Sequence, residues 1–197
     1  VYGGRKKRTA DSVIVGYVDS DWAGDPDTFY SRGGHVHCMW GTPVSWQSQK
    51  MKAVAASSCE SEYMAGSRAV REAIWLRYLL SDMGYGDLST KHFGKFVDAD
   101  FAKVRLSGLV DVHEKPISIF CDNKGAVDSS YNPTSHDRMK HVARRHYFVR
   151  DMVEAFEIVV PYVNTHDNAA DFFTKPLPPA KFFEFRAIIM NEPDVLA

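Results

Sequence analysis

An apolar run that ends in carboxylates constrains this chain more than any other stretch. Residues 13–18 read Val-Ile-Val-Gly-Tyr-Val, and Asp19 and Asp21 follow closely. Apolar side chains at successive positions are typical of a central strand that is covered on both faces. A carboxylate is costly inside such a strand, whereas at the strand's end it can bind a metal ion. We therefore predict a central strand over residues 13–22 with an acidic end.

The totals favour one soluble domain. The 197 residues are enough to enclose a hydrophobic core, and 45% hydrophobic with 25% charged residues is an ordinary globular composition. A net charge of -1 means that nucleic-acid contacts would need a local basic patch. No apolar run is long enough to span a bilayer, so we expect no membrane partner. Cys38, Cys59 and Cys121 lack metal-ligand spacing and suggest a reducing compartment.

Turn signals divide residues 13–47 into three strands. Gly24-Asp25-Pro26-Asp27 follows the first strand, and residues 34–40 and 43–47 are predicted as the second and third. Residues 41–43 are short enough for a hairpin turn, so the three strands should be antiparallel. The basic residues 5–8 lie in a predicted flexible segment, 1–11. A solvated chain end is favoured there over a nucleic-acid tail or a targeting signal.

A long helix is predicted over residues 58–82. Its core-facing stripe is Glu62, Gly66, Ala69, Ala73, Leu76 and Leu80, whose small residues would let the helix lie close to the sheet. Glu62 is the only charge on that stripe, and Glu60 lies on the opposite face. A core-facing carboxylate is costly unless it is paired or binds a metal. Glu62 is therefore either a metal ligand or a capping residue of the first turn.

The second half of the chain adds a parallel strand pair and further helices. A strand at 116–121 ends at Asp122, and a short helix to about residue 131 suggests a parallel crossover. A helix at 136–156 precedes a last strand at 157–163, where Pro161 indicates an edge or a bulge. Asp171 lies in a helical turn at 169–173. A final helix at 179–190 brings core-filling residues, namely Phe182, Phe183, Phe185, Ile188 and Ile189.

Two stretches leave alternatives open. Residues 85–115 would hold a short helix or an added hairpin. From His136 to Arg150 there are five Lys or Arg residues and one Asp, and Lys140, His141 and Arg144 lie on the outer face of the predicted helix. That face is either simply solvated or tracks the phosphates of a nucleic acid.

Four acids are predicted to meet at one edge of the sheet: Asp19, Glu62, Asp122 and Asp171. Four unpaired carboxylates that close would repel one another, and divalent cations would relieve the repulsion. Oxygen ligands suit Mg²⁺ or Mn²⁺, and two such ions can promote in-line displacement at a phosphodiester. The residues alone therefore indicate metal-dependent phosphoryl chemistry.

Several blocks of the sequence resemble the ribonuclease H domain of copia-type retrotransposon Pol polyproteins. The matching blocks are residues 17–25, 44–46, 57–65, 119–123 and 170–177, together with Asn132-Pro133, His136, Lys140-His141 and residues 146–148. The resemblance covers about residues 13–190 apart from 87–113. It implies one ribonuclease H-like domain over 12–190 with an insert at about 87–113, followed by a tail at 191–197.

The resemblance implies an α/β fold with a five-stranded mixed sheet, three antiparallel strands followed by two parallel ones, and helices on both faces. It implies cleavage of the RNA strand of RNA–DNA hybrids with two Mg²⁺ or Mn²⁺ ions held by Asp19, Glu62, Asp122 and Asp171. Asp21 is a reserve candidate, since it faces the same side as Asp19 if the strand continues. His166 would assist proton transfer or product release, although a plain loop histidine is the favoured interpretation. Candidate nucleic-acid contacts are Ser20, Asn123, Lys140, His141 and Arg144.

The expected partners are an RNA–DNA hybrid and the reverse transcriptase part of a parent polyprotein. The expected location is intracellular, in a cytoplasmic particle or the nucleus. A second hypothesis is a catalytically silent module of the same fold that binds nucleic acid or protein. A third is an aspartyl phosphotransferase, because Asp19-Ser20-Asp21 also matches a strand-end Asp-x-Asp nucleophile motif. The third hypothesis does not explain Glu62.

Overall fold

The computed structural model describes residues 13–85, 116–132, 143–190 and 192, with the backbone alone at 84–85 and 143–147. Its elements are β1 (Ile14–Asp21), β2 (Arg32–Met39), β3 (Thr42–Lys50), α1 (Ser58–Leu80), the π-helical turn η1 (Ser81–Tyr85), β4 (Ile117–Cys121), α3 (Lys124–Tyr131), α4 (Ala143–Glu154), β5 (Ile158–Val159), the 3₁₀ helices η5 (Thr165–Asp167) and η6 (Ala169–Phe173), and α5 (Pro179–Ile189). The predicted segments 1–11 and 87–113, the start of the predicted helix at 136–156 and most of the tail lie outside the described residues.

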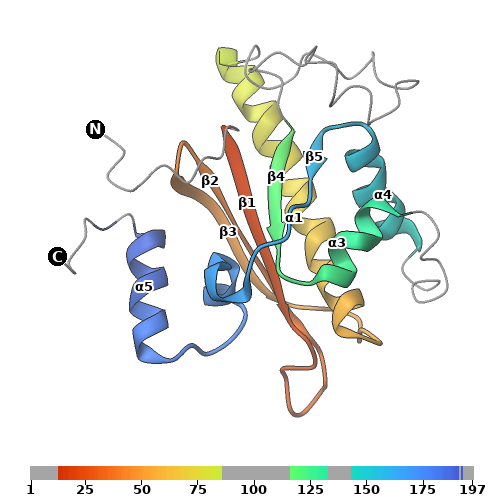
Figure 1. Ribbon diagram of the computed structural model, residues 1–197, viewed down its shortest axis with the longest axis vertical. Helices are drawn as coiled ribbons and strands as arrows, with labels where there is room; N and C mark the ends of the chain where they lie inside the picture. Colours follow the sequence, from red (N-terminus) through yellow and green to blue (C-terminus); the bar gives the residue numbers. More distant parts are fainter. Residues whose placement is uncertain (1–12, 86–115, 133–142, 191, 193–197) are drawn as a thin grey trace.

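The strands form one mixed sheet in the order β3-β2-β1-β4-β5 (Figure 1). β1 pairs with β2 and β2 with β3 in antiparallel fashion, while β4 runs parallel to β1 and β5 parallel to β4. The predicted five-stranded sheet and its strand directions are therefore confirmed. Residues of β1 are buried along almost the whole strand, as the continuous apolar run predicts for the centre of a sheet.

The hairpin between β2 and β3 turns one residue earlier than predicted. Its two turn residues are Trp40 and Gly41, both with positive φ (48° and 81°), whereas Thr42 and Pro43 already pair in β3. Two left-handed residues match the right-handed twist of the flanking strands, which is why such short turns are favoured. β2 and β3 also extend further from the turn than predicted, to Arg32 and Lys50.

Helical elements cover both faces of the sheet. A Cβ on Gly33 would meet Ala65 of α1, whereas a Cβ on the next residue, Gly34, would meet Phe173 and Thr174. Because successive strand residues point to opposite faces, α1 and η6 lie on opposite sides of the sheet. α1 packs with α3 and α4 on one side, and η6 packs on β1 and β2 from the other, with α5 beside it (Figure 1).

The start of α1 is fixed by local hydrogen bonds. The Ser57 side chain accepts from the backbone N–H of Glu60, and the Glu60 carboxylate accepts from the N–H of Ala56 at 2.7 Å. Glu60, not Glu62, is thus the capping acid, and it is buried although it lies off the core stripe.

Gly66 corrects a further prediction. An added Cβ there would meet nothing within 4 Å, so this glycine is not what brings the helix close to the sheet.

The remaining elements differ from prediction mainly in extent and burial. β5 ends before Pro161, yet the chain stays alongside β4, because Cys121 N–H donates to the Pro161 carbonyl and Val163 N–H to that of Cys121.

In α5 only Phe185 is fully buried. Phe182 and Phe183 are 40% and 54% exposed, so the prediction that they fill the core is wrong. Their helix packs chiefly on η6 and not on the sheet. Within the described residues, no helix is both long and apolar enough to cross a membrane.

Candidate carboxylate site at the end of the central strand

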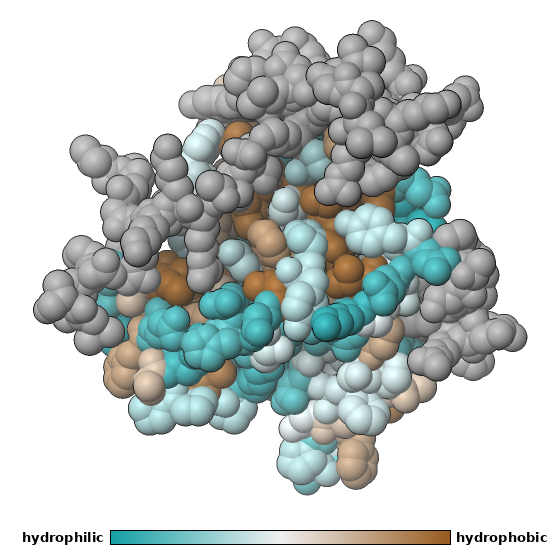
Figure 2. All heavy atoms as spheres, in the orientation of Figure 1, coloured by the Kyte–Doolittle hydropathy of each residue, from teal (hydrophilic) through white to brown (hydrophobic). Residues whose placement is uncertain are grey.

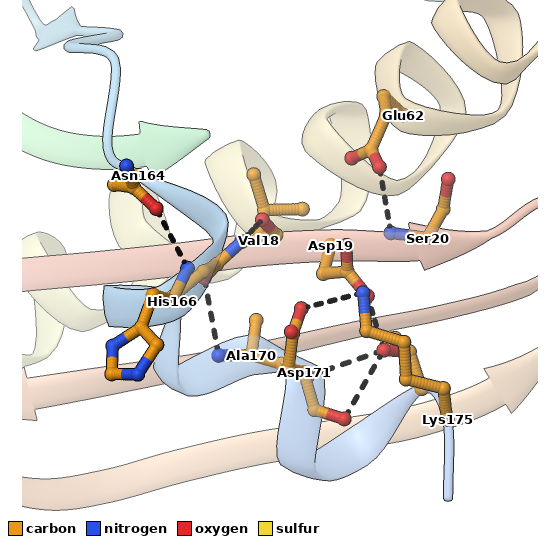
Figure 3. A network of polar contacts seen from close by, with 11 residues as sticks. Val18, Asp19, Ser20, Glu62, Asn164, His166, Ala170, Asp171 and Lys175 are labelled. Carbon is orange, nitrogen blue, oxygen red and sulfur yellow. Dashed lines mark hydrogen bonds and ion pairs between the residues drawn. The ribbon is translucent and has the colours of Figure 1, made fainter. Parts of the chain in front are cut away.

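Asp19 lies near the end of β1 and is only 2% exposed. It is in register with Gly34 of β2, so both residues face the η6 side of the sheet. The Thr174 hydroxyl donates to Asp19 Oδ2, and Lys175 Nζ lies 3.6 Å from the same oxygen. Asp19 is therefore oriented by two residues that directly follow η6. Figure 3 shows one of them, Lys175, beside Asp19.

Glu62 reaches the end of β1 from the other face of the sheet. It lies in the first turns of α1, and its Oε1 accepts a hydrogen bond from the backbone N–H of Ser20 at 3.1 Å (Figure 3). Its second oxygen, Oε2, is buried and has no hydrogen-bond partner among the described residues. A buried carboxylate oxygen without a donor is costly, and a bound cation would remove that cost.

Asp122 joins the two sides of the site. It directly follows β4, the strand parallel to β1. Asp122 belongs to two groups of possible metal ligands, Asp19–Asp122–Asp171 and Glu62–Cys121–Asp122. Within each group the ligand atoms lie within 4.8 Å of one another. The structure thus brings all four predicted acids to one end of the sheet, linked through Asp122.

Asp171 is carried by η6, which a buried asparagine anchors. Asn168 caps η6 by accepting from the N–H of Ala170, and its Nδ2 donates to the carbonyl of Val18 at 2.9 Å. The absence of a side chain at Gly34 lets η6 lie directly on β2. Figure 2 shows hydrophilic residues gathered in a band across this face of the molecule, over η6.

Burial and mutual repulsion raise the pKa values of three of the acids. Burial, followed by the nearby Asp19 and Asp122 charges, raises the pKa of Glu62 well above its usual value. Burial also raises the pKa of Asp19, against the opposing effects of Lys175 and Thr174. The pKa of Asp171 rises to about 6, again through burial and then Asp19. In each case the largest cause is burial, which disfavours the charged carboxylate.

The donor atoms fit a divalent cation. One group offers only carboxylate oxygens, which Mg²⁺ and Mn²⁺ prefer. The other adds the Cys121 thiol, which burial keeps protonated by raising its pKa. The unpartnered Glu62 Oε2 is the observation that most directly calls for a cation. Asp19, Glu62, Asp122 and Asp171 are therefore the residues that would hold the ions.

The other predicted site residues lie apart from these groups or outside the description. Asp21 belongs to neither group, and its carboxylate lies where a Cβ on Gly24 would be. His166 is exposed on η5, with its ring near Lys181 and turned away from Asp19 in Figure 3. Its catalytic role stays a prediction.

The nucleic-acid candidates stay predictions as well. Ser20 orients Glu62 through its backbone, and Asn123 caps α3 by accepting from Ala126 N–H. Lys140, His141 and the side chain of Arg144 lie outside the described residues.

Sequence reasoning did not single out Asn168, Thr174 and Lys175. An Asn directly before a predicted helical turn is a recognisable N-cap signal, so the capping role of Asn168 could have been predicted from the sequence. Its contact with Val18 joins residues 150 positions apart, and no local pattern encodes that distance. Thr174 and Lys175 lie in a matched block, but only the fold brings them to Asp19.

Comparison with known proteins identifies the relatives of this chain. It is 35% identical over 173 residues to a retrovirus-related Pol polyprotein from transposon RE1 of Arabidopsis thaliana and 32% identical over 173 residues to one from transposon TNT 1-94 of Nicotiana tabacum. The chain is a homologue of the copia-type retrotransposon Pol polyproteins. These alignments cover 88% of the chain but only about a tenth of each relative, 10% and 11%. No protein-family model matches it.

Solved structures agree on the fold of this Pol homologue. An N-terminal ribonuclease H domain from Mycobacterium tuberculosis, solved as a fusion with maltose-binding protein, has a TM-score of 0.51 at 13% identity, with 88% of this chain and 95% of that chain covered. The foamy viral protease–reverse transcriptase, solved in complex with RNA/DNA hybrid, has a TM-score of 0.50 at 14% identity, with 83% and 20% covered. At these identities the likeness establishes the ribonuclease H fold alone.

Proposed function

We propose that this chain is a metal-dependent endoribonuclease that cleaves the RNA strand of RNA–DNA hybrids during retrotransposon reverse transcription. The observation that carries the proposal is the convergence of four buried or half-buried carboxylates in two groups that share Asp122. The relationship to Pol polyproteins and the ribonuclease H fold support the same activity. The ions proposed for this site are Mg²⁺ or Mn²⁺, two per chain.

The chain's residues would bind the ions and hold their ligands in place. When bound, the two ions supply charge stabilisation for the attacking and leaving oxygens of an in-line displacement at a phosphodiester. Ser20 N–H holds one oxygen of Glu62 and leaves the other available as a ligand. Thr174 orients Asp19 by its hydroxyl, and Asn168 fixes the helix that carries Asp171. This positioning is what the protein itself contributes.

The substrate and the cellular setting belong to the same proposal. The foamy viral protein of similar fold was solved with an RNA/DNA hybrid, which supports a hybrid as the substrate here. The proposed nucleic-acid contacts are Ser20, Asn123, Lys140, His141 and Arg144, and His166 is proposed to assist proton transfer or product release. The reverse transcriptase part of a parent polyprotein is the proposed protein partner. A cytoplasmic particle or the nucleus is the proposed location.

The direct test is cleavage of an end-labelled RNA–DNA hybrid by the 197-residue chain with Mg²⁺ or Mn²⁺. We expect RNA-strand cuts that EDTA abolishes and that Asp122→Asn reduces at least about a hundredfold, because both ligand groups lose their shared member. Asp128→Asn is a matched control, since Asp128 is an exposed acid on the neighbouring helix α3. Equal activity of wild type and the Asp122 variant would refute the assignment.

The silent binding module remains the alternative function. It predicts hybrid binding that weakens with salt and no cleavage under any metal condition. A filter-binding titration beside the cleavage assay therefore separates the two functions. The phosphotransferase hypothesis predicts a trappable phospho-aspartate at Asp19. It has less support, because Asp21, its second acid, stands outside both carboxylate groups.

A further inference from the structure

A lysine enters the carboxylate site from the C-terminal side of η6. Lys175 Nζ lies 2.9 Å from Asp171 Oδ1 and 3.6 Å from Asp19 Oδ2, so one ammonium bridges acids of β1 and η6 (Figure 3). Its side chain is 31% exposed, whereas those of Asp19 and Asp171 are 3% and 7% exposed. The ammonium thus stands at the solvent side of two buried carboxylates.

Other lysine–acid pairs of the described residues lie elsewhere. Lys50 pairs with Asp25 at the turn after β1, and Lys181 pairs with Glu184 within α5. Neither acid belongs to the two carboxylate groups. Lys175 is therefore distinguished by its partners, two of the three acids in the all-oxygen group.

We propose that Lys175 is a built-in counter-ion that competes with a divalent cation for Asp19 and Asp171. The inference rests on the proposed metal-dependent function. An ammonium in contact with these oxygens opposes a cation that binds them, both by occupying the space and by charge repulsion. Metal binding then requires the lysine to swing outward. Its four-carbon stem and exposed side allow this without a backbone change.

The exchange has two measurable consequences. In the metal-free protein Lys175 offsets repulsion among buried acids, so its removal should lower the unfolding temperature. In the presence of metal the same removal should tighten binding, because no resident charge has to be displaced. A purely structural role would lower the unfolding temperature equally with and without metal. A deficit in unfolding temperature that is present without metal and absent with metal is what identifies a competitor.

The test compares wild type with Lys175→Met and Lys175→Arg in the full 197-residue chain. Mn²⁺ binding is measured by titration calorimetry, and thermal unfolding is measured in EDTA and in saturating Mn²⁺. We expect Lys175→Met to bind Mn²⁺ about tenfold more tightly. It should also unfold at a lower temperature in EDTA and lose that deficit in Mn²⁺. Lys175→Arg, which keeps the charge, should bind no more tightly than wild type.

Lys50→Met is the matched control, since it breaks a lysine–aspartate pair outside the site and should leave Mn²⁺ affinity unchanged. Lys175→Gln replaces the Met variant if the latter does not fold. Unchanged or weaker Mn²⁺ binding by the charge-free variant overturns the counter-ion proposal alone. Absence of Mn²⁺ binding in wild type and variant alike refutes both this proposal and the metal-dependent function.

Discussion

The side-chain amide of Asn168 donates to the carbonyl of Val18, the residue directly before Asp19, with 2.9 Å between Nδ2 and O. Both residues are almost completely buried. The same side chain accepts from Ala170 N–H, so one residue ties the start of η6 to the end of β1. A hydrogen bond that neither acid makes therefore helps to hold Asp171 beside Asp19.

We expect Asn168→Ala to lower both stability and hybrid cleavage. The change removes a helix cap and leaves a buried carbonyl without its donor, which together should cost about 2 to 4 kcal/mol of unfolding free energy. Cleavage should fall at least about tenfold, because a ligand displaced by a fraction of an ångström binds poorly. Denaturant unfolding and the labelled-hybrid assay measure the two effects.

Asn164→Ala provides the control for that change. Asn164 caps η5 in the same way, but it is exposed, and its hydrogen bonds in the described part of the chain are local. Its loss should cost about 1 kcal/mol or less. Equal behaviour of the two variants would show that the Val18 contact has no special role.

Gly34→Ala should impair the site while leaving the sheet folded. The new Cβ would lie 2.8 Å from Thr174 Cγ2 and 2.9 Å from Phe173 Cβ, so η6 must move away from β2. We expect weaker Mn²⁺ binding and slower cleavage. In contrast, Gly66→Ala meets nothing within 4 Å and should stabilise α1 by up to about 1 kcal/mol. Mn²⁺ titration calorimetry, the labelled-hybrid assay and denaturant unfolding of both variants check the contrast.

Arg77→Met should be among the most destabilising single changes in the described part of the chain. Arg77 and Glu157 form a buried ion pair, and Arg77 NH2 also donates to the Glu157 carbonyl at 2.8 Å. Removing the guanidinium leaves a buried carboxylate unpaired, which costs about 3 to 5 kcal/mol. The double change with Glu157→Met should recover most of the loss. An unfolding free energy within about 1 kcal/mol of wild type for Arg77→Met alone would contradict this account.

Two buried histidines of β2 should make stability fall with acid. Burial lowers the pKa of His35 to about 4 and that of His37 to about 3, so both stay neutral in the fold. The unfolded chain takes up protons near pH 6.5 and the folded chain does not, so stability is lost as pH falls below that value. Between pH 7 and pH 5 each histidine should cost about 2 kcal/mol.

The acids of the site act in the opposite sense, so the histidine effect must be isolated. The raised pKa values of Asp19, Glu62 and Asp171 mean that the folded chain gains protons more readily than the unfolded chain as pH falls. Urea unfolding of wild type and His35→Gln at both pH values separates the contribution of the histidine from that of the acids. The variant should lose about 2 kcal/mol less than wild type over this range. Parallel losses would refute the histidine contribution.

The sequence was most informative where pattern and topology carry the same information. The apolar run before Asp19 predicts a central strand, and the crossover places Asp122 beside it, so convergence at one sheet edge follows from strand order. Helical periodicity likewise separated Glu62 from Glu60, although Glu60 proved to be buried as the capping acid. Such features depend on periodicity and on the order of the elements along the chain, and both can be read directly from the sequence.

Contacts between distant elements were not predictable in the same way. Gly34 looks like any strand glycine until η6 lies on it, and Gly66 looked necessary for packing where no close contact exists. Phe182 and Phe183 resemble core residues, yet their helix packs on η6 and leaves them partly exposed. In each case the size or hydrophobicity of the side chain was evident from the sequence. Which element it packs against depends on the tertiary structure.

The placement of Asp122 has a wider consequence. Glu62 arrives with the helical layer on one side of the sheet and Asp171 with η6 on the other, and Asp122 belongs to a group with each. The site therefore spans both faces of the sheet, and the distances between its acids depend on how closely each layer packs. Any substitution that moves either layer off the sheet, however far it lies from an acid, would separate the metal ligands.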